Sequence, residues 1–150
     1  MLGLCKTNYF SRVGRLMAID YGTKRTGLAV TDPLQIIATG LETVSTSDVV
    51  VYIKNYSAKE KIDAFIIGIP LHLNNTDAAI VPLIRQFIAK LKEQIPNVEV
   101  HEVDERFTSK IAQRSMIESG QNKKTRRNKS LLDKISATII LQSWLEHLKR

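Results

Sequence analysis

Four carboxylates at three places in the sequence are the side chains best suited to carry out chemistry. They are Asp20, the neighbours Asp104 and Glu105, and Asp133. Asp20 and Asp104 each follow an apolar run typical of a strand, and open α/β sheets form their sites at the carboxyl ends of strands. Divalent cations such as Mg²⁺ bind carboxylate oxygens and keep several waters, as phosphodiester hydrolysis requires. We therefore expect acids from distant segments to converge on one metal-dependent site.

Each acid also has a purely structural interpretation. Asp20 precedes a glycine turn, where an aspartate often accepts hydrogen bonds from its own backbone. Glu105 has a neighbouring cation, Arg106, with which it can form an ion pair. Asp133 stands three residues after Ser130, which is the spacing of a helix-capping box, and we expect it in the first turn of the last helix. Capping and metal binding are compatible at Asp133, so both interpretations stay open.

The apolar pattern predicts a mixed α/β sheet flanked by helices, which would position these acids. Strands are expected over 15–19, 26–31, 35–44, 62–69 and 98–103, and helices from 47, over 76–95, over 108–120 and over 130–148. The run 62–69 is continuously apolar, as in a parallel strand covered on both faces. Three opening strands followed by alternating helices and strands are typical of a mixed sheet rather than a barrel or a bundle. Trp144, in the last helix, is expected to cover the edge of the sheet.

Length and composition indicate one domain. A chain of 150 residues with 43% hydrophobic residues is large enough to bury one core, and we expect a single domain over 15–150. Residues 1–14 are basic, contain no acid and have no clear period, so we expect a disordered extension. The one cysteine, Cys5, excludes an internal disulfide framework and a Cys-rich zinc site. Together with the lack of a long apolar run, this predicts a cytoplasmic protein without a membrane partner, whose metal is held by oxygen atoms.

Positive charge is concentrated in a segment that precedes Asp133. The net charge is +7, and the charged residues of 122–129 are all basic. This basic segment contains Lys123, Lys124, Arg126, Arg127 and Lys129. Clustered lysine and arginine release counterions from phosphates on binding, so the segment indicates a polyanionic partner. A solvated charge run without a partner is the alternative.

Five short segments form a series along the chain. They are DYGTKRTGLAV (20–30), TDPL (31–34), IGIPL (67–71), VDERFT (103–108) and DKISATIILQSWL (133–145). Together they resemble the YqgF family of Holliday-junction-resolvase-like proteins, regarded as pre-16S ribosomal RNA nucleases. The similarity runs from about Arg15 to the C-terminus. The family often has a glycine in the loop after Leu71, whereas this chain has Asn75 near that place; asparagine tolerates left-handed geometry, so the turn can be retained.

The resemblance implies an RNase H-like fold and a metal-dependent nuclease. Its acidic triad would be Asp20, Glu105 and Asp133, with Mg²⁺ or Mn²⁺ as the metal. The matching positions select Glu105 rather than Asp104. The substrate implied is precursor 16S ribosomal RNA, processed at its 5′ end, and ribosomal particles are a further implied partner.

Nucleic-acid contacts are expected from cations near the acids. Lys24, Arg25 and Arg106 would steady the strand near the metal, and the basic segment would clamp backbone phosphates. A Holliday junction resolvase would apply the same metal chemistry to branched DNA, and a noncatalytic nucleic-acid-binding module would use the basic charge alone. Actin-like ATPases and sugar kinases begin with a similar Asp-x-Gly-Thr hairpin, but this chain is short for their two lobes and lacks a second glycine-rich phosphate loop.

Overall fold

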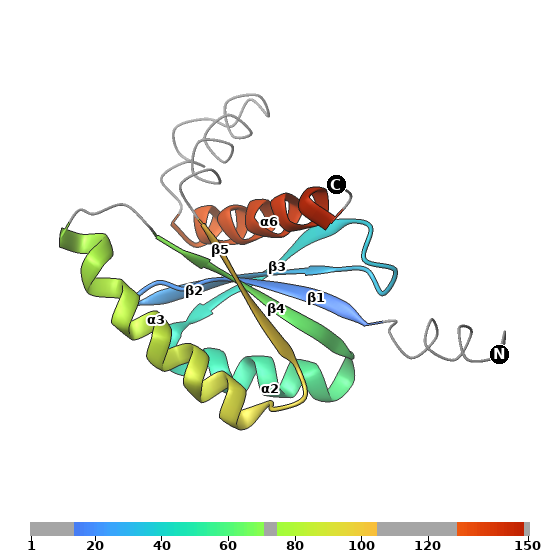
Figure 1. Cartoon of the computed structure of the whole chain (residues 1–150), viewed down its shortest axis with the longest axis horizontal. Helices are drawn as coiled ribbons and strands as arrows, with labels where there is room; N and C mark the ends of the chain where they lie inside the picture. Colours follow the sequence, from blue (N-terminus) through green and yellow to red (C-terminus); the bar gives the residue numbers. More distant parts are fainter. Residues whose placement is uncertain (1–13, 71–74, 105–128, 149–150) are drawn as a thin grey trace, which may run out of the picture.

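A mixed sheet between two layers of helix forms the described part of the chain (Figure 1). The computed structural model describes residues 14–70, 75–104 and 129–148. Its strands are β1 (Arg15–Asp20), β2 (Arg25–Thr31), β3 (Ala38–Ser45), β4 (Ile62–Ile69) and β5 (Glu99–Asp104). Its helices are the short 3-10 helix η1 (Thr46–Asp48), α2 (Val49–Lys59), α3 (Asn75–Gln94) and α6 (Lys129–Leu148). The predicted fold class, a mixed five-stranded sheet flanked by helices, is confirmed.

The strand order brings the ends of three parallel strands to one edge of the sheet. The order is β3-β2-β1-β4-β5, in which β2 is antiparallel to both β1 and β3, while β4 is parallel to both β1 and β5. Ile19 of β1 pairs with Ile67 of β4, and Ile69 of β4 pairs with Asp104 of β5. Asp20 and Asp104 therefore end their strands at the same edge, which we call the carboxyl edge.

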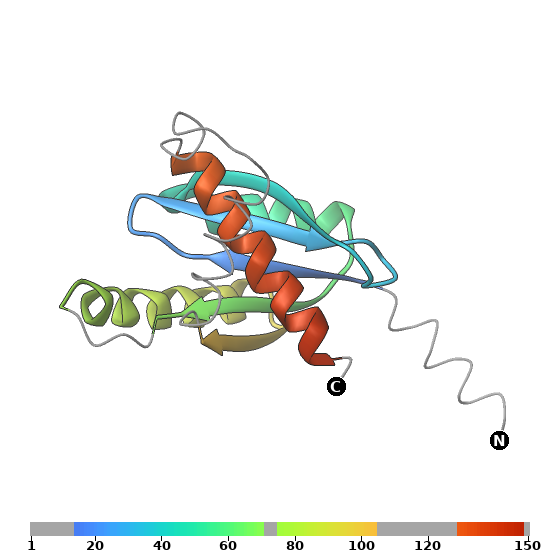
Figure 2. The ribbon, with the colours of Figure 1, turned by 90° about the horizontal axis from the view of Figure 1, so that it is seen from above.

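Alternation along the strands gives the sheet two different faces. On one face, large side chains pack against α2 and α3; among them are Met17, Ile19, Leu28, Phe65 and Ile67. The other face is built largely from smaller side chains, among them Ala18, Ala29 and Ala64, which pack against α6. Small residues let a helix approach closely, and α6 crosses the sheet diagonally on this face (Figure 2). Asp20 is two residues beyond Ala18, so it continues the face that α6 covers.

The third strand begins at Ala38, and the prediction that it begins at Gln35 is wrong. The carboxylate of Asp32 accepts hydrogen bonds from the N–H groups of Leu34, Ile36 and Ile37, which closes residues 32–37 into a loop. Gln35 has a φ of 57° in this loop, a left-handed conformation that does not fit a strand. The backbone hydrogen bond from Ile37 is the main cause of a lowered pKa of Asp32.

Two helices begin at residues other than those that the sequence predicted. The helix after β3 begins at Val49, behind η1, rather than at Ser47. The last helix begins at Lys129, so Asp133 lies in its second turn rather than its first. A capping box requires Ser130 to precede the helix, whereas Ser130 lies inside it, and the capping-box interpretation is therefore wrong. The predicted helix 108–120 and residues 1–13 of the predicted extension lie outside the described residues.

No helix in the described ranges has both the length and the apolar character needed to cross a bilayer.

Candidate metal centre and nucleic-acid interface

Asp20 and Asp133 come together at the carboxyl edge because α6 lies directly on Gly27. Gly27 of β2 is the residue paired with Asp20 of β1. A Cβ atom added to Gly27 would overlap the carbonyl oxygen of Asp133 and would lie 3.1 Å from the Cβ of Asp133. Only glycine leaves room for this approach. Two acids from opposite ends of the sequence therefore share one face and one edge of the sheet.

Arg25, at the start of β2, forms an ion pair with Asp133. Its Nε donates a hydrogen bond to Oδ2 of Asp133 over 3.2 Å. The Arg25 side chain is 38% exposed and the Asp133 side chain is 27% exposed, so water screens the pair only in part. The sequence predicted a phosphate contact for Arg25 and a metal contact for Asp133. The structure brings these two predicted site residues into direct contact with each other.

The turn between β1 and β2 carries Asp20 at one end and Arg25 at the other. A Cβ atom at Gly22 would overlap the carbonyl oxygen of Arg25, so the turn is too tight for any other residue there. The ring of Tyr21 packs on that of Phe87 in α3, with 5.0 Å between centroids. Lys24 is exposed in the same turn, beside the acids, where a cation can meet a phosphate. We call residues 20–25 the acidic turn.

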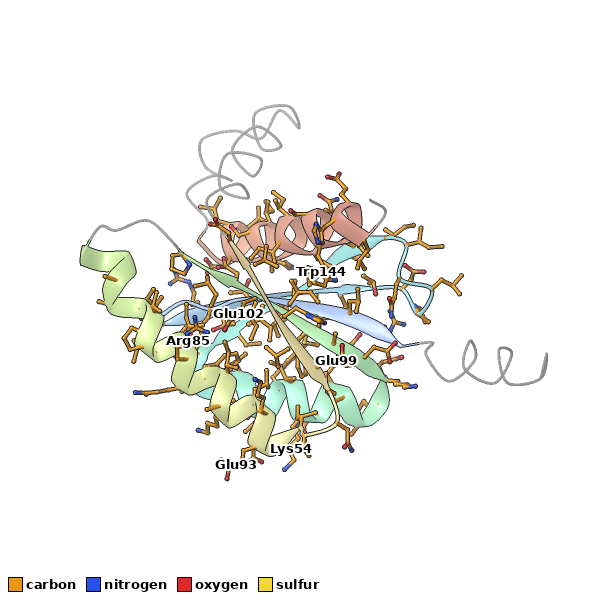
Figure 3. All side chains as sticks on the ribbon, viewed as in Figure 1. Lys54, Arg85, Glu93, Glu99, Glu102 and Trp144 are labelled. Atoms are coloured by element: carbon orange, nitrogen blue, oxygen red, sulfur yellow. The ribbon has the colours of Figure 1, made fainter. Side chains whose placement is uncertain are left out.

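Asp104 lies at the carboxyl edge but on the other face of the sheet. Two residues earlier, Glu102 pairs with Arg85 of α3, and Figure 3 shows both side chains between β5 and α3. By alternation Asp104 shares that face, whereas Val103 packs with the α6 face. At the open edge of the sheet, Asp104 also lines a cavity of about 240 Å³ with Trp144 of α6. By strand alternation, Asp104 therefore differs from Asp20 in the face of the sheet that it continues.

The remaining predicted site residues lie outside the described part of the chain. These are Glu105, Arg106, Lys123, Lys124, Arg126 and Arg127, and of Lys129 only the backbone, at the start of α6, is described. Within the described ranges, no group of three or more His, Cys, Asp and Glu side chains is arranged to hold a metal ion. The described part supplies two of the expected ligands, Asp20 and Asp133. Both offer carboxylate oxygens, which suit Mg²⁺ or Mn²⁺ and not a soft metal.

Trp144 covers the edge strand, as predicted, and helps to form a groove that the sequence did not reveal. Its ring stacks on His101 of β5 with 4.7 Å between centroids. Nε2 of His101 lies 3.3 Å from a carboxylate oxygen of Glu99. Nearby, residues at the amino ends of β1, β4 and β5 line a groove of about 560 Å³. This groove is at the opposite end of the sheet from Asp20 and is not part of the site around Asp20 and Asp133, which we call the acidic site.

Comparison with known proteins gives a consistent set of matches. A family model described as "RuvX: Holliday junction resolvase" matches residues 14–147. A protein of Amoebophilus asiaticus is 50% identical over 92% of this chain and 98% of its own length. Proteins of Bacteroides fragilis and Porphyromonas gingivalis are 51% and 46% identical, over 89% and 92% of this chain and 97% and 100% of their own lengths. All three carry the name "Putative pre-16S rRNA nuclease".

One solved structure shows the fold. RuvC of T. thermophilus, solved in complex with a Holliday junction substrate, aligns with a TM-score of 0.56 at 16% identity. The alignment covers 90% of this chain and 96% of that chain. The RNase H-like fold that the sequence predicted is thereby confirmed.

Proposed function

Because the chain belongs to the RuvX family, whose model is described as a Holliday junction resolvase, we propose that it is a metal-dependent nuclease that hydrolyses phosphodiester bonds. One observation carries the proposal: Asp20 and Asp133 share a face at the carboxyl edge of an RNase H-like sheet. A module that only binds nucleic acid has no use for two acids beside a phosphate, since they repel it. Their convergence therefore favours catalysis over simple binding.

The metal ligands in this proposal are Asp20, Glu105 and Asp133, with Mg²⁺ or Mn²⁺ as the ion. The ion would activate a water molecule and offset charge on the scissile phosphate. Asp20 ends β1, the central strand between β2 and β4, so it would serve as the central ligand. Asp133 would approach it from α6, held by the contact with Gly27. Arg25 offsets the charge of Asp133 and limits the repulsion between the two acids.

Glu105 is preferred to Asp104 as the third acid because its place in the segment VDERFT (103–108) matches the acid of the family motif that this segment resembles. Asp104 shares the α3 face with Glu102, whereas Asp20 and Asp133 occupy the α6 face. Asp104 is therefore the less suitable partner for Asp20 and Asp133. Glu105→Gln is expected to abolish cleavage, and Asp104→Asn is expected to retain most of it.

Contacts with nucleic acid are assigned to cations around the acids. They are Lys24, Arg25 and Arg106 together with the basic segment of Lys123, Lys124, Arg126, Arg127 and Lys129. Lys24 and Arg25 belong to the acidic turn, and Lys129 opens the helix that carries Asp133. Such contacts hold the backbone in register and do not select a base sequence.

The substrate that we propose is precursor 16S ribosomal RNA, cut at its 5′ end, either free or within ribosomal particles. The names of the relatives support this choice, because this chain matches nearly the whole length of each relative. The alternative is a resolvase that acts on branched DNA, which the description of the family model favours. Both substrates present phosphates to the same acids.

The test gives the purified chain precursor 16S RNA and a four-way DNA junction in parallel, each with Mn²⁺ and with EDTA. Metal-dependent cutting of the RNA near its 5′ end, with the junction left intact, is the expected result. Selective cutting of the junction would establish the resolvase function instead. Tight binding of both substrates without any cutting would leave a noncatalytic binding module as the function.

A further inference from the structure

We propose that Thr46 is a positioning residue for the acidic site, because its side chain fixes the acidic turn that joins Asp20 to Arg25. Its catalytic consequence rests on the proposed nuclease function, whereas its effect on the turn does not. Thr46 is the first residue of η1, directly after β3, and none of the acidic motifs includes it. It reaches the turn only because β3 pairs with β2 at this end of the sheet, where Arg25 is opposite Ser45.

Three hydrogen bonds connect Thr46 with its surroundings. Its hydroxyl donates to the carbonyl oxygen of Gly22 over 2.6 Å, and its N–H donates to the carbonyl oxygen of Lys24 over 3.0 Å. Its Oγ1 also lies 2.9 Å from Oγ1 of Thr26. A carbonyl oxygen can only accept, so the single hydroxyl proton of Thr46 is directed at Gly22. The hydroxyl of Thr26 must then donate to Oγ1 of Thr46, so the donor and the acceptor of each of the three hydrogen bonds are determined.

This set of bonds anchors the acidic turn to the core. Thr26 has no exposed surface and follows Arg25 in β2, so its hydroxyl is held rigidly by the strand. Thr46 is half-buried. Because it is bonded to Thr26, it holds the carbonyl groups of Gly22 and Lys24 in fixed positions relative to the sheet. Removing the hydroxyl of Thr46 would leave the buried Thr26 donor and the Gly22 carbonyl without this partner. The turn would then be free to shift relative to the sheet.

Such a shift would displace both acids of the site, because each is connected to one end of the turn. Asp20 begins the turn, and Arg25, which ends it, holds the carboxylate of Asp133. A displacement of about 1 Å in a catalytic arrangement can lower the rate about 100-fold. The three hydrogen bonds of Thr46 described above connect it with Gly22, Lys24 and Thr26, so it acts through the turn. The expected effect is on turnover, and binding of nucleic acid by the surrounding cations is expected to change little.

Thr31 provides a matched control at the other end of β2. Its side chain is 1% exposed, and its Oγ1 accepts a hydrogen bond from the N–H of Leu16 over 2.9 Å. Replacing either threonine with valine removes one hydrogen-bonded hydroxyl at nearly equal volume, from Thr31 at the end of β2 or from Thr46 directly after β3. Of these two threonines, only Thr46 forms hydrogen bonds with the acidic turn, so the two variants separate a loss of general stability from a loss of positioning.

The experiment compares Thr46→Val, Thr46→Ser and Thr31→Val with the unmodified chain. Cleavage is measured with Mn²⁺ over a range of substrate concentrations, and amide hydrogen exchange of residues 21–25 is measured in the metal-free protein. Thr46→Val is expected to lower kcat about 10- to 100-fold with a KM within about threefold of the original. Thr46→Ser, which keeps the hydroxyl, should retain most of kcat. Thr31→Val should melt several degrees earlier, as Thr46→Val does, and yet keep kcat.

Exchange of the acidic turn provides the second readout. Only Thr46→Val is expected to accelerate exchange at 21–25, by about tenfold or more. Equal losses of kcat in Thr46→Val and Thr31→Val, or unchanged exchange at 21–25 in Thr46→Val, would overturn the proposal. If the unmodified chain cuts no nucleic acid, the nuclease function fails, and the exchange comparison still decides the role of Thr46. If Thr46→Val does not fold, Thr46→Ala replaces it, since alanine removes the hydroxyl without adding bulk.

Discussion

The guanidinium of Arg25 and the carboxylate of Asp133 form an ion pair across 108 residues of sequence, with 3.2 Å between Nε and Oδ2. The pair joins the start of β2 to the second turn of α6, directly beside the end of β1. In the metal-free protein Arg25 therefore neutralises an acid that we propose as a metal ligand. A bound cation would take over that electrostatic role, and Arg25 would become available to a phosphate.

Arg25→Ala is expected to increase the stabilisation of the protein by Mn²⁺. Without the guanidinium, the charges of Asp20 and Asp133 are less compensated, so a divalent cation has more repulsion to relieve. Because the pair is partly exposed, the metal-free variant should lose only about 0.2 to 1 kcal/mol of stability. Melting temperatures with and without Mn²⁺ measure both effects. Arg15→Ala is the control, since Arg15 pairs with Glu60, and it should leave the Mn²⁺ shift unchanged.

A Mn²⁺ shift in Arg25→Ala no larger than that of the unmodified chain would contradict the account of the pair. It would mean that the charge of Asp133 is not part of the metal site.

Gly27→Ala is expected to destabilise the protein and to abolish cleavage. The added methyl group would overlap backbone atoms of Asp133, which cannot rotate away, so α6 must move off β2. Overpacking of this kind costs about 1 to 3 kcal/mol. Gly40→Ala is the control beneath the same helix, because its methyl group would meet only side-chain atoms, Cγ of Lys134 at 2.8 Å and Oγ1 of Thr138 at 3.2 Å, which can rotate while the backbone of α6 stays in place.

Cleavage and melting temperature distinguish the two glycine variants. Gly40→Ala should lose less stability than Gly27→Ala and should still cut. Normal cleavage by Gly27→Ala would show that the approach of α6 to this point is not needed for the reaction.

Several parts of the fold were predictable because they depend on local apolar patterns. The run 62–69 is buried on both faces of the sheet, and its length and composition alone indicate a central strand. The start of β3 was not predictable in the same way. The sequence of 35–37 suits a strand, but the carboxylate of Asp32 competes for the N–H groups of Leu34, Ile36 and Ile37 and folds them into a loop.

Within the candidate site, the sequence singled out the acids as candidates but did not reveal the residues that hold them in place. Asp20 stood out because a charge beside apolar strands is uncommon, and Asp133 because it follows the basic segment near the start of the last helix. The pairing of Arg25 with Asp133 had no sequence signal, since it depends on where α6 crosses the sheet. Thr46 had none either, because a threonine in a run of serines and threonines is unremarkable until its hydroxyl is found on the carbonyl of Gly22.

Asp133→Asn is expected to leave stability nearly unchanged while metal-dependent cleavage and stabilisation by Mn²⁺ are lost. Asparagine keeps an oxygen that can accept from Arg25, but it removes the charge that attracts the ion. The metal-free variant should stay within about 1 kcal/mol of the original, because the pair is partly exposed. Thermal melts with and without Mn²⁺, followed by cleavage assays, provide the measurement. A variant that melts earlier but cuts normally would assign Asp133 a purely structural role in α6.

Replacing Lys123, Lys124, Arg126 and Arg127 with alanine is expected to weaken binding to all nucleic-acid sequences alike. Each lost phosphate contact should reduce the slope of log K against log salt by about one. Binding is measured on two unrelated RNA sequences over a series of salt concentrations. The control replaces Lys54 and Lys59, which are exposed on α2 across the sheet from α6. An unchanged salt slope in the fourfold variant would exclude the basic segment from the interface.

The most direct test of the central claim is the rate of Mn²⁺-dependent cleavage by Asp20→Asn. Asparagine preserves size and hydrogen bonding at the end of β1 and removes the charge that would hold the ion. Loss of several kcal/mol of metal-assisted stabilisation corresponds to a rate about 10²- to 10⁴-fold lower. Asp63→Asn is the matched control, since Asp63 lies at the opposite end of the sheet and accepts a hydrogen bond from Gln35.

Asp20→Asn should therefore bind nucleic acid normally and fail to cut it, while Asp63→Asn cuts at the original rate. Cleavage by Asp20→Asn within a few-fold of the original rate would contradict the account, because the site would then not depend on the acid at the end of its central strand.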